Sequence, residues 1–428
     1  MRAGAGGDVN VARGEGGMIR VTAAPVVDRA EDGGADAVDP GFTGAVLDVA
    51  GAALVWPVLG EPGLPVAEVH DVGRAQQWLW AVYGERTAAA VDACAAGEPA
   101  GVRVAADATA LAGGAARLGF GHWASRWWPA SYADGIPALE PDVLGLELAA
   151  LTHRCQQLFD DFGDQPDDCV AELIEEHQAA LDPLTEWWRA MPQPADTARH
   201  LESVLRLIDD AADSAGLDGP ALRRLRASLD RRRPADTPVR PGALFARDEG
   251  YALAAGEPLP ANGRVIARGS GTNDWRRYPP GFVDASEHAV SWTARALGAR
   301  RRIEVEVVAH VAAPVGGAPL VAEVRVNGGL PDRVFLARRD DMWTGRADLD
   351  LRLPAGAMPP RFEVDVLLPG FDPGPGSEGR ADREAIRALI RRRLATAAQH
   401  PADDAAPHDT SSGPFLAEIA AAATGEDY

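Results

Sequence analysis

The apolar side chains of this chain change their spacing near its middle, and that change limits the folds open to it. Between residues 71 and 233 they recur every three or four positions, as in the run from Leu201 to Ile208. Between residues 303 and 368 they alternate with polar residues, as in the run from Ile303 to Val307. The first spacing is typical of amphipathic helices and the second of strands with one buried face. We therefore expect an α+β multidomain protein, with an N-terminal α-helical domain, an antiparallel β-sandwich-like domain and a basic C-terminal helix.

Proline-rich and glycine-rich stretches set the expected boundaries. Within the helical part, Asp71 is suited to an N-cap and Pro141 to a first turn. Pro183 should disturb a helix that begins near residue 167, and residues 41–66 leave strand and buried coil both open. Met18 is a candidate for the true start. We expect a flexible N-terminal extension over 1–40, a mainly α-helical domain over 41–233, a Pro-rich linker over 234–241, a sandwich domain over 242–370, a Gly/Pro linker over 371–379, a basic helix over 380–398 and a flexible tail over 399–428.

The chain has no lysine, so all 42 of its basic residues are arginine. A Schiff base, a P-loop lysine and a lysine general base are therefore excluded. Abundant Ala, Gly, Pro and Arg favour the coding bias of a high-GC bacterium as the cause. Selection against lysine modification is the alternative interpretation, and the sequence leaves both open.

Charge and cysteine content restrict the partners and the compartment. The net charge is −21, which disfavours nucleic acid and anionic membranes and favours a protein partner with a basic or neutral surface. Three cysteines without a CxxC motif do not form a disulfide framework, so we expect a cytoplasmic protein. The most apolar stretch, residues 45–59, is too short and too interrupted to span a bilayer.

An aromatic segment over residues 119–141 is the most unusual stretch of the chain. Aromatic residues beside an arginine are common at recognition surfaces, although they also suit a plug that seals a helical core. The segment predicts a binding site formed by His122, Trp123, Arg126, Trp127, Trp128 and Tyr132.

The basic helix predicts a second contact surface. Its arginines could bind a partner, or they could dock within the chain on the acid-rich segment over 140–190, whose only arginines are Arg154 and Arg189. The candidate docking residues are Arg387, Arg391, Arg392 and Arg393.

Motifs of catalysis and metal binding are weak. Cys155 and Cys169 are too far apart for the usual close pair of zinc ligands. The GxGxxG string over 374–379 contains a proline and follows an alternating strand, which disfavours a dinucleotide site. Ser286 lies near Asp284 and His288 but in no GxSxG elbow. We expect no catalytic residue, no metal and no cofactor.

These observations favour a non-catalytic interaction, adaptor or regulatory protein within a multi-protein system. The alternative is a small-molecule binder or enzyme with an aromatic-lined pocket in the helical domain. A third hypothesis is a subunit that is stable only within an assembly.

Overall fold

The chain divides into two compact units, each assembled from non-contiguous segments. Unit 1 comprises residues 1–128, 139–246 and 388–428, and unit 2 comprises residues 129–138 and 247–387. The computed structural model describes residues 7–23, 41–60, 63–97, 101–106, 109–159, 166–190, 194–231, 244–245, 264–298, 300–310, 313–314, 319–349, 360–371, 379–399 and 413–424.

Unit 1 contains an antiparallel six-stranded sheet in the order β3-β4-β5-β2-β1-β6. Residues 7–23, expected within a flexible extension, form two of its strands, in which alternate side chains such as Val9, Val11 and Val21 are buried. Residues 41–66, left open between strand and coil, supply further strands. The strands are β1 (Gly7–Arg13), β2 (Ile19–Ala23), β3 (Gly44–Val49), β4 (Ala52–Pro57), β5 (Val66–Val69) and β6 (Gly101–Ala106).

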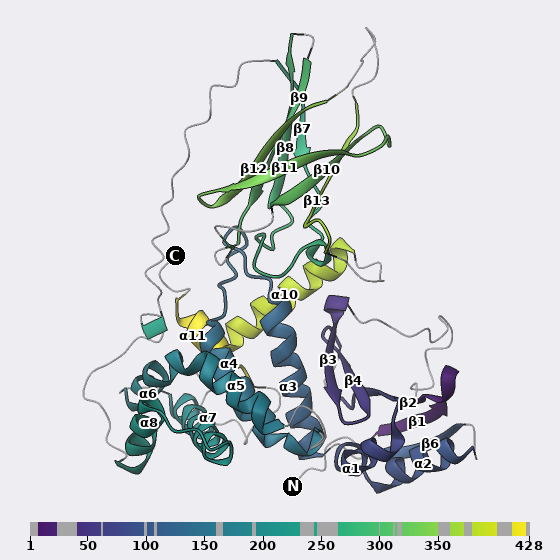
Figure 1. Ribbon diagram of the computed structural model, residues 1–428, viewed down its shortest axis with the longest axis vertical. Helices are drawn as coiled ribbons and strands as arrows, with labels where there is room; N and C mark the ends of the chain where they lie inside the picture. The colour runs from purple at the N-terminus through teal and green to yellow at the C-terminus, as the bar shows by residue number, and fades with distance from the viewer. Residues whose placement is uncertain are drawn as a thin grey trace. The chain divides into compact units, whose positions relative to one another are not determined.

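The helical periodicity of unit 1 is confirmed (Figure 1). Asp71 caps the first helix by accepting a hydrogen bond from the backbone N–H of Arg74 at 3.1 Å, and Pro141 lies in the first turn of α4. The helices are α1 (Val72–Tyr83), α2 (Glu85–Ala96), α3 (Ala110–Trp127), α4 (Pro141–Arg154), α5 (Pro166–His177), α6 (Leu181–Arg189), α7 (Ala195–Ser214), α8 (Pro220–Arg231) and α11 (Leu416–Thr424).

Helix α3 joins the sheet of unit 1 to its helices. It packs on β3 and β4 on one side and on α4 on the other, while α2 covers β1 and β6. Gly119 permits the sheet contact, because a Cβ there would lie 3.2 Å from the Trp56 ring. Helix α11 lies against α4 within a segment expected to be a flexible tail.

Unit 2 contains an antiparallel seven-stranded sheet in the order β13-β10-β11-β12-β9-β8-β7. The alternating segments form strands as expected, and Asn327 and Gly328 make the turn after β10 with positive φ angles of 54° and 73°. Leu351 and Leu353 lie outside the described residues. The strands are β7 (Arg264–Ser270), β8 (Val290–Leu297), β9 (Arg300–Val308), β10 (Leu320–Val326), β11 (Asp332–Arg339), β12 (Met342–Leu349) and β13 (Phe362–Leu367); helix α10 (Arg380–Ala398) follows.

The seven-stranded sheet curls until its two edge strands approach each other (Figure 1). The chain leaving β7 meets β13, where the Thr272 N–H donates to the Val364 carbonyl oxygen at 2.8 Å. The described strands form one sheet around a core that includes Val290, Ile303 and Val305. The sandwich expected from the strand spacing is therefore not confirmed.

Replacing Gly271 with alanine should lower the free energy of unfolding by about 1–3 kcal/mol. The added Cβ would lie 2.6 Å from the Val364 carbonyl oxygen and 2.5 Å from Val290 Cγ1, at the point where the sheet edges meet. Urea unfolding followed by tryptophan fluorescence measures the change. Gly219→Ala is the control, because its Cβ would meet nothing within 4 Å. Equal stability of the two variants would show that the edges do not approach this closely.

Candidate functional sites

The aromatic segment begins inside the core of unit 1. Trp123 is 3% exposed, and its indole Nε1–H donates to the Phe42 carbonyl oxygen at 2.7 Å. Its ring stacks on Phe120 with the centroids 5.1 Å apart. Burial lowers the pKa of the neighbouring His122 below its ordinary value. Trp123 therefore has the contacts of a core residue.

The remaining residues of the predicted aromatic site are divided between the units. The Arg126 guanidinium lies 5.0 Å from the centroid of the Trp127 ring, and Trp127 lies 6.1 Å from Phe42. Trp128 ends the first segment of unit 1, whereas Tyr132 belongs to unit 2. His122, Trp123, Arg126 and Trp127 thus lie on α3 of unit 1, and Tyr132 lies in unit 2.

Tyr132 lies on a loop with a fixed backbone, residues 129–138, which we name the Tyr132 loop. Ser131 and Ile136 exchange two backbone hydrogen bonds of 2.8 Å. Asp284, which is 3% exposed, accepts from the Ser131 hydroxyl and from the Tyr132 N–H, each at 2.8 Å. The Tyr132 side chain itself is 54% exposed. The loop therefore presents an aromatic side chain on a backbone that is already ordered.

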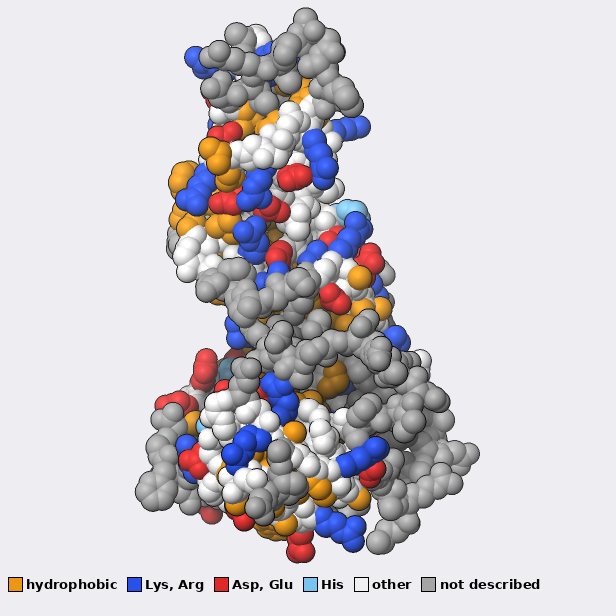
Figure 2. All heavy atoms as spheres, turned by 90° about the vertical axis from the view of Figure 1, so that its right-hand side faces the viewer, with side chains coloured by type: hydrophobic (Ala, Val, Ile, Leu, Met, Phe, Trp, Pro, Cys, Tyr) orange, Lys and Arg blue, Asp and Glu red, His pale blue; other side chains and the backbone are white. Residues whose placement is uncertain are grey.

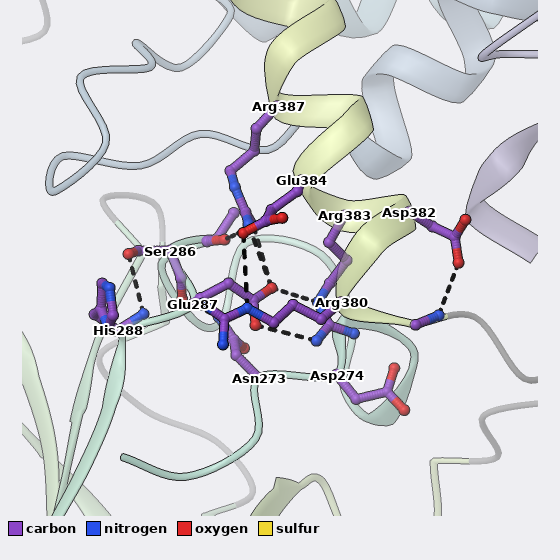
Figure 3. A network of polar contacts seen from close by, with 12 residues as sticks. Asn273, Asp274, Ser286, Glu287, His288, Arg380, Asp382, Arg383, Glu384 and Arg387 are labelled. Carbon is purple, nitrogen blue, oxygen red and sulfur yellow. Dashed lines mark hydrogen bonds and ion pairs between the residues drawn. The ribbon is translucent and has the colours of Figure 1, made fainter. Parts of the chain in front are cut away.

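A cluster of charged residues in unit 2 joins α10 to the turn before β8 (Figure 3). The Arg383 guanidinium donates to both carboxylate oxygens of Glu287, at 2.6 and 3.2 Å. Arg387 donates to the same carboxylate at 3.3 Å and to the Ala285 carbonyl oxygen at 3.0 Å. It also lies 5.7 Å from the Trp275 ring centroid. We name this set the Glu287 cluster.

Electrostatics favour the ionised form of Glu287. Burial by itself raises the pKa of its carboxyl, but hydrogen bonds and charge interactions with Arg383 and Arg387 outweigh burial and hold the pKa below its ordinary value. Both arginines are also buried, at 4% exposure each. Two guanidinium groups and one carboxylate thus neutralise much of one another's charge away from water.

Ser286 takes part in turn geometry. Its backbone N–H donates to Asp284 Oδ1 at 2.8 Å, and its hydroxyl oxygen accepts from the backbone N–H of His288 at 3.1 Å (Figure 3). The Asn273 side-chain amide stabilises the same turn: its Nδ2 donates to the carbonyl oxygens of Asp284 and Ser286, at 2.9 and 2.6 Å. His288 contributes its backbone rather than its ring to Ser286, which is not the arrangement of a serine nucleophile and its base.

A second charged cluster lies in unit 1, around Glu147 of α4. One carboxylate oxygen accepts from Arg117 at 2.7 Å and lies 3.0 Å from His200 Nε2, while the other accepts from the Leu416 N–H at 2.7 Å. Burial raises the pKa of Glu147, but Arg117 and His200 outweigh it, so the net pKa is lowered. Glu147 is 1% exposed and Arg117 is 6% exposed. We name this set the Glu147 cluster.

The Glu147 cluster holds the C-terminal segment of the chain. Arg117 donates to the carbonyl oxygens of Gly413 and Pro414, at 2.7 and 3.1 Å. Its guanidinium lies 4.5 Å from the Phe415 ring centroid. Arg393 adds a bidentate pair with Glu418, at 2.6 and 2.7 Å. Residues far apart in sequence therefore converge on the start of α11.

The basic helix lies where the sequence predicts it, but two of its arginines have partners outside the acid-rich segment. Arg387 pairs with Glu287 and Arg393 with Glu418, so neither pair involves residues 140–190. Arg391 and Arg392 lie on the exposed side of α10. Partner binding through these two remains a prediction.

The described part of the chain holds no group of three His, Cys, Asp or Glu side chains placed to ligate an ion. Burial raises the pKa of the Cys155 thiol to about 12. His177 Nδ1 lies 3.0 Å from an Asp142 carboxylate oxygen. Residues 374–378 of the GxGxxG string lie outside the described residues.

The sequence did not reveal the charged clusters. Arg117 and Glu147 each interrupt an otherwise apolar helical stretch, and a lone charge in such a stretch is the signal that could have found them. The sequence around Glu287 and Arg383 gives no comparable signal. Glu287 lies in a turn and Arg383 on a polar helix, and charged residues are common at the surface of both.

Among the helices that the structure describes, none combines the length and apolar character needed to cross a membrane. No protein family, curated protein or solved structure matches the chain.

Replacing Glu287 with glutamine should lower the free energy of unfolding by about 3–5 kcal/mol at pH 7, because it removes the carboxylate that pairs with both buried guanidinium groups and leaves Arg387 to the longer pair with Asp134, at 3.6 Å. The difference from wild type should shrink in acid. Since the pKa of Glu287 is lowered on folding, its stabilisation is present above the ordinary pKa of 4.5 and is lost as the pH falls through the folded-state pKa. Urea unfolding at several pH values measures both effects.

The control for Glu287→Gln is Asp182→Asn, which removes the partner of Arg224 at the surface, where both side chains are more than half exposed. Such exposed pairs contribute little to stability. Losses of similar size in the two variants would contradict a buried, mutually neutralising cluster in unit 2.

Proposed function

We propose that this chain is a non-catalytic interaction protein that engages a protein partner through the Tyr132 loop. The supporting observation is that Tyr132 is 54% exposed on a backbone held by the buried Asp284 carboxylate. Tyrosine is enriched among the residues that dominate binding energy at interfaces. An ordered loop also loses little conformational entropy on binding, which favours affinity.

The hydrogen bonds of the buried carboxylates support a structural rather than a catalytic role for them. The carboxylates of Glu147, Glu287 and Asp284 each accept from two or more donors of the chain itself. A general base or nucleophile instead needs a lone pair directed at substrate. These carboxylates therefore act as internal acceptors that fix loops and helix ends.

The net charge and the exposed hydrophobic side chains support a protein partner with a basic or neutral surface. The net charge of −21 favours such a face over nucleic acid. Figure 2 shows exposed hydrophobic side chains beside arginines and acids over the sheet of unit 2. Phe335 on β11 is 68% exposed and Leu330 before it is 93% exposed. The proposal includes an adaptor or regulatory role in a multi-protein system of the cytoplasm.

Site-specific cross-linking tests the proposal. A photoreactive benzoylphenylalanine at position 132 should cross-link one dominant protein in cells of the native host, identified by mass spectrometry. The matched control carries the same group at Trp80, which is 50% exposed on α1 of unit 1. With the purified partner, Tyr132→Ala should weaken binding by about tenfold or more, whereas Tyr132→Phe should change it little.

Cross-linking at position 132 no more specific than at position 80 would contradict the proposal. So would a Tyr132→Ala variant that binds the purified partner as tightly as wild type does.

A further inference from the structure

Arg301 lies on the core-facing side of the sheet in unit 2. Strands β12, β9, β8 and β7 are neighbours in that sheet (Figure 1). Arg301 of β9 is paired with Ala296 of β8 and with Leu349 of β12. Directly paired residues of antiparallel strands point to the same face, and Leu349 is a core residue at 6% exposure. The partly buried Arg301 side chain therefore extends from the face that carries the core.

The acidic residues of these four strands lie on the opposite face. The glutamates of β9 and Asp348 of β12 alternate with the core residues of their strands, so they point away from the core. Arg295 and Arg302 pair with Glu304 and Asp348 on that outer face, at 3.3 and 2.8 Å. Among the described residues of the four strands, no acidic side chain shares the face of Arg301.

Within the described part of the chain, Arg301 makes its hydrogen bonds through one nitrogen. Nη1 donates to the carbonyl oxygens of Gly298 and Arg300, at 2.9 and 3.0 Å, in the hairpin between β8 and β9. Nε is buried and meets no acceptor among the described residues. Arg383 and Arg393 use the edge formed by Nε and Nη2 to donate to both oxygens of a carboxylate. The same edge of Arg301 is therefore available for a carboxylate.

Arg301 differs in this respect from the arginines of the two charged clusters. Arg117, Arg383, Arg387 and Arg393 each pair with a carboxylate of the chain. A charge removed from water without a counter-charge is costly. A carboxylate that accepts from two guanidinium nitrogens at once reduces that cost and forms a strong ion pair. A carboxylate from outside the chain would thus supply the contact that Arg301 lacks.

The residues around Arg301 on the core face are small or apolar. The adjacent row across the strands consists of Ala294, Ile303 and Ala347. Ala294 and Ile303 are buried, whereas Ala347 is only partly buried, as is Ala296 in the row of Arg301. Ligand sites commonly combine an apolar lining with a few polar groups that fix orientation. Partly exposed methyl groups beside one guanidinium suit a ligand with an apolar chain and one negative group.

We propose that the core face beside the β8–β9 hairpin is a binding site for a carboxylate that carries an apolar chain, and we name it the Arg301 site. The carboxylate accepts from Nε and Nη2 of Arg301, whose planar fork matches both oxygens, and the chain packs on Ala296 and Ala347.

The Arg301 site is separate from the Tyr132 loop, so the inference does not depend on the proposed function. The loop is held by Asp284, whose N–H donates to the Val308 carbonyl oxygen at 3.0 Å. Val308 ends β9, whereas Arg301 lies at its beginning.

Isothermal titration calorimetry of the whole chain with octanoate tests the inference. Octanoate should bind, whereas acetate, which lacks the chain, and octanol, which lacks the charge, should each bind at least about tenfold more weakly. Arg301→Gln should weaken octanoate binding at least about tenfold, because it removes a charge-assisted pair. The matched control is Arg346→Gln, which replaces an exposed arginine on the outer face of β12 and should bind octanoate as wild type does.

A second variant, Ala296→Glu, keeps Arg301 and places a carboxylate directly opposite it. Opposite charges in such a cross-strand pair are stabilising, so this variant should unfold at a urea concentration no lower than that of wild type. Its carboxylate should compete with octanoate for the guanidinium and weaken octanoate binding at least about tenfold. Unchanged octanoate binding in Ala296→Glu would overturn the site.

Four further results would overturn the inference. The first is wild-type affinity for octanoate in Arg301→Gln, and the second is an equal loss of affinity in Arg346→Gln. Binding of octanol or acetate as tight as that of octanoate would show that the charge or the chain is not recognised. Absence of octanoate binding at millimolar concentration would contradict the proposed ligand class.

Discussion

Buried arginine–carboxylate pairs are the interaction on which the arrangement of each unit depends. A buried charge is costly unless a partner and hydrogen bonds compensate it. Glu147 therefore specifies where Arg117 and the start of α11 must lie, and Glu287 specifies the same for the first turns of α10. In each unit one carboxylate brings together segments that lie about one hundred residues or more apart in sequence.

At these buried positions arginine makes combinations of contacts that suit a guanidinium better than the ammonium group of lysine. Arg117 contacts a carboxylate, two carbonyl oxygens and an aromatic ring at once. Arg393 makes a bidentate pair while lying over a ring. A planar guanidinium with five donors can do this, whereas an ammonium group is a compact point charge. The several simultaneous contacts at these buried positions suit the geometry of arginine.

Local patterns predicted the elements of the fold better than its long-range contacts. The three-and-four spacing from Leu201 to Ile208 and the alternation from Ile303 to Val307 each describe one segment, so they identified α7 and β9. The strands at residues 7–23 were missed because they are short and are separated by Gly14, Gly16 and Gly17, and their stability comes from pairing with β5 and β6. Closure of the curled sheet rests on a contact between Thr272 and Val364, which no local pattern encodes. The charge pattern marks Glu147 only as one acid of the segment over 140–190, because its buried partners Arg117, His200 and Leu416 lie outside that segment.

The stability of Arg117→Lys, compared with that of Arg223→Lys in the same unit, tests the central role of buried arginine geometry most directly. Arg223 is 61% exposed and pairs with Asp218 at the surface. Urea unfolding should show a loss of about 2 kcal/mol or more for Arg117→Lys, because lysine keeps the charge but has a single nitrogen in place of the two through which Arg117 reaches Gly413 on one side and Glu147 and Pro414 on the other. Arg223→Lys should be close to wild type. Equal stability of the two variants would contradict the account, because charge alone would then suffice at position 117.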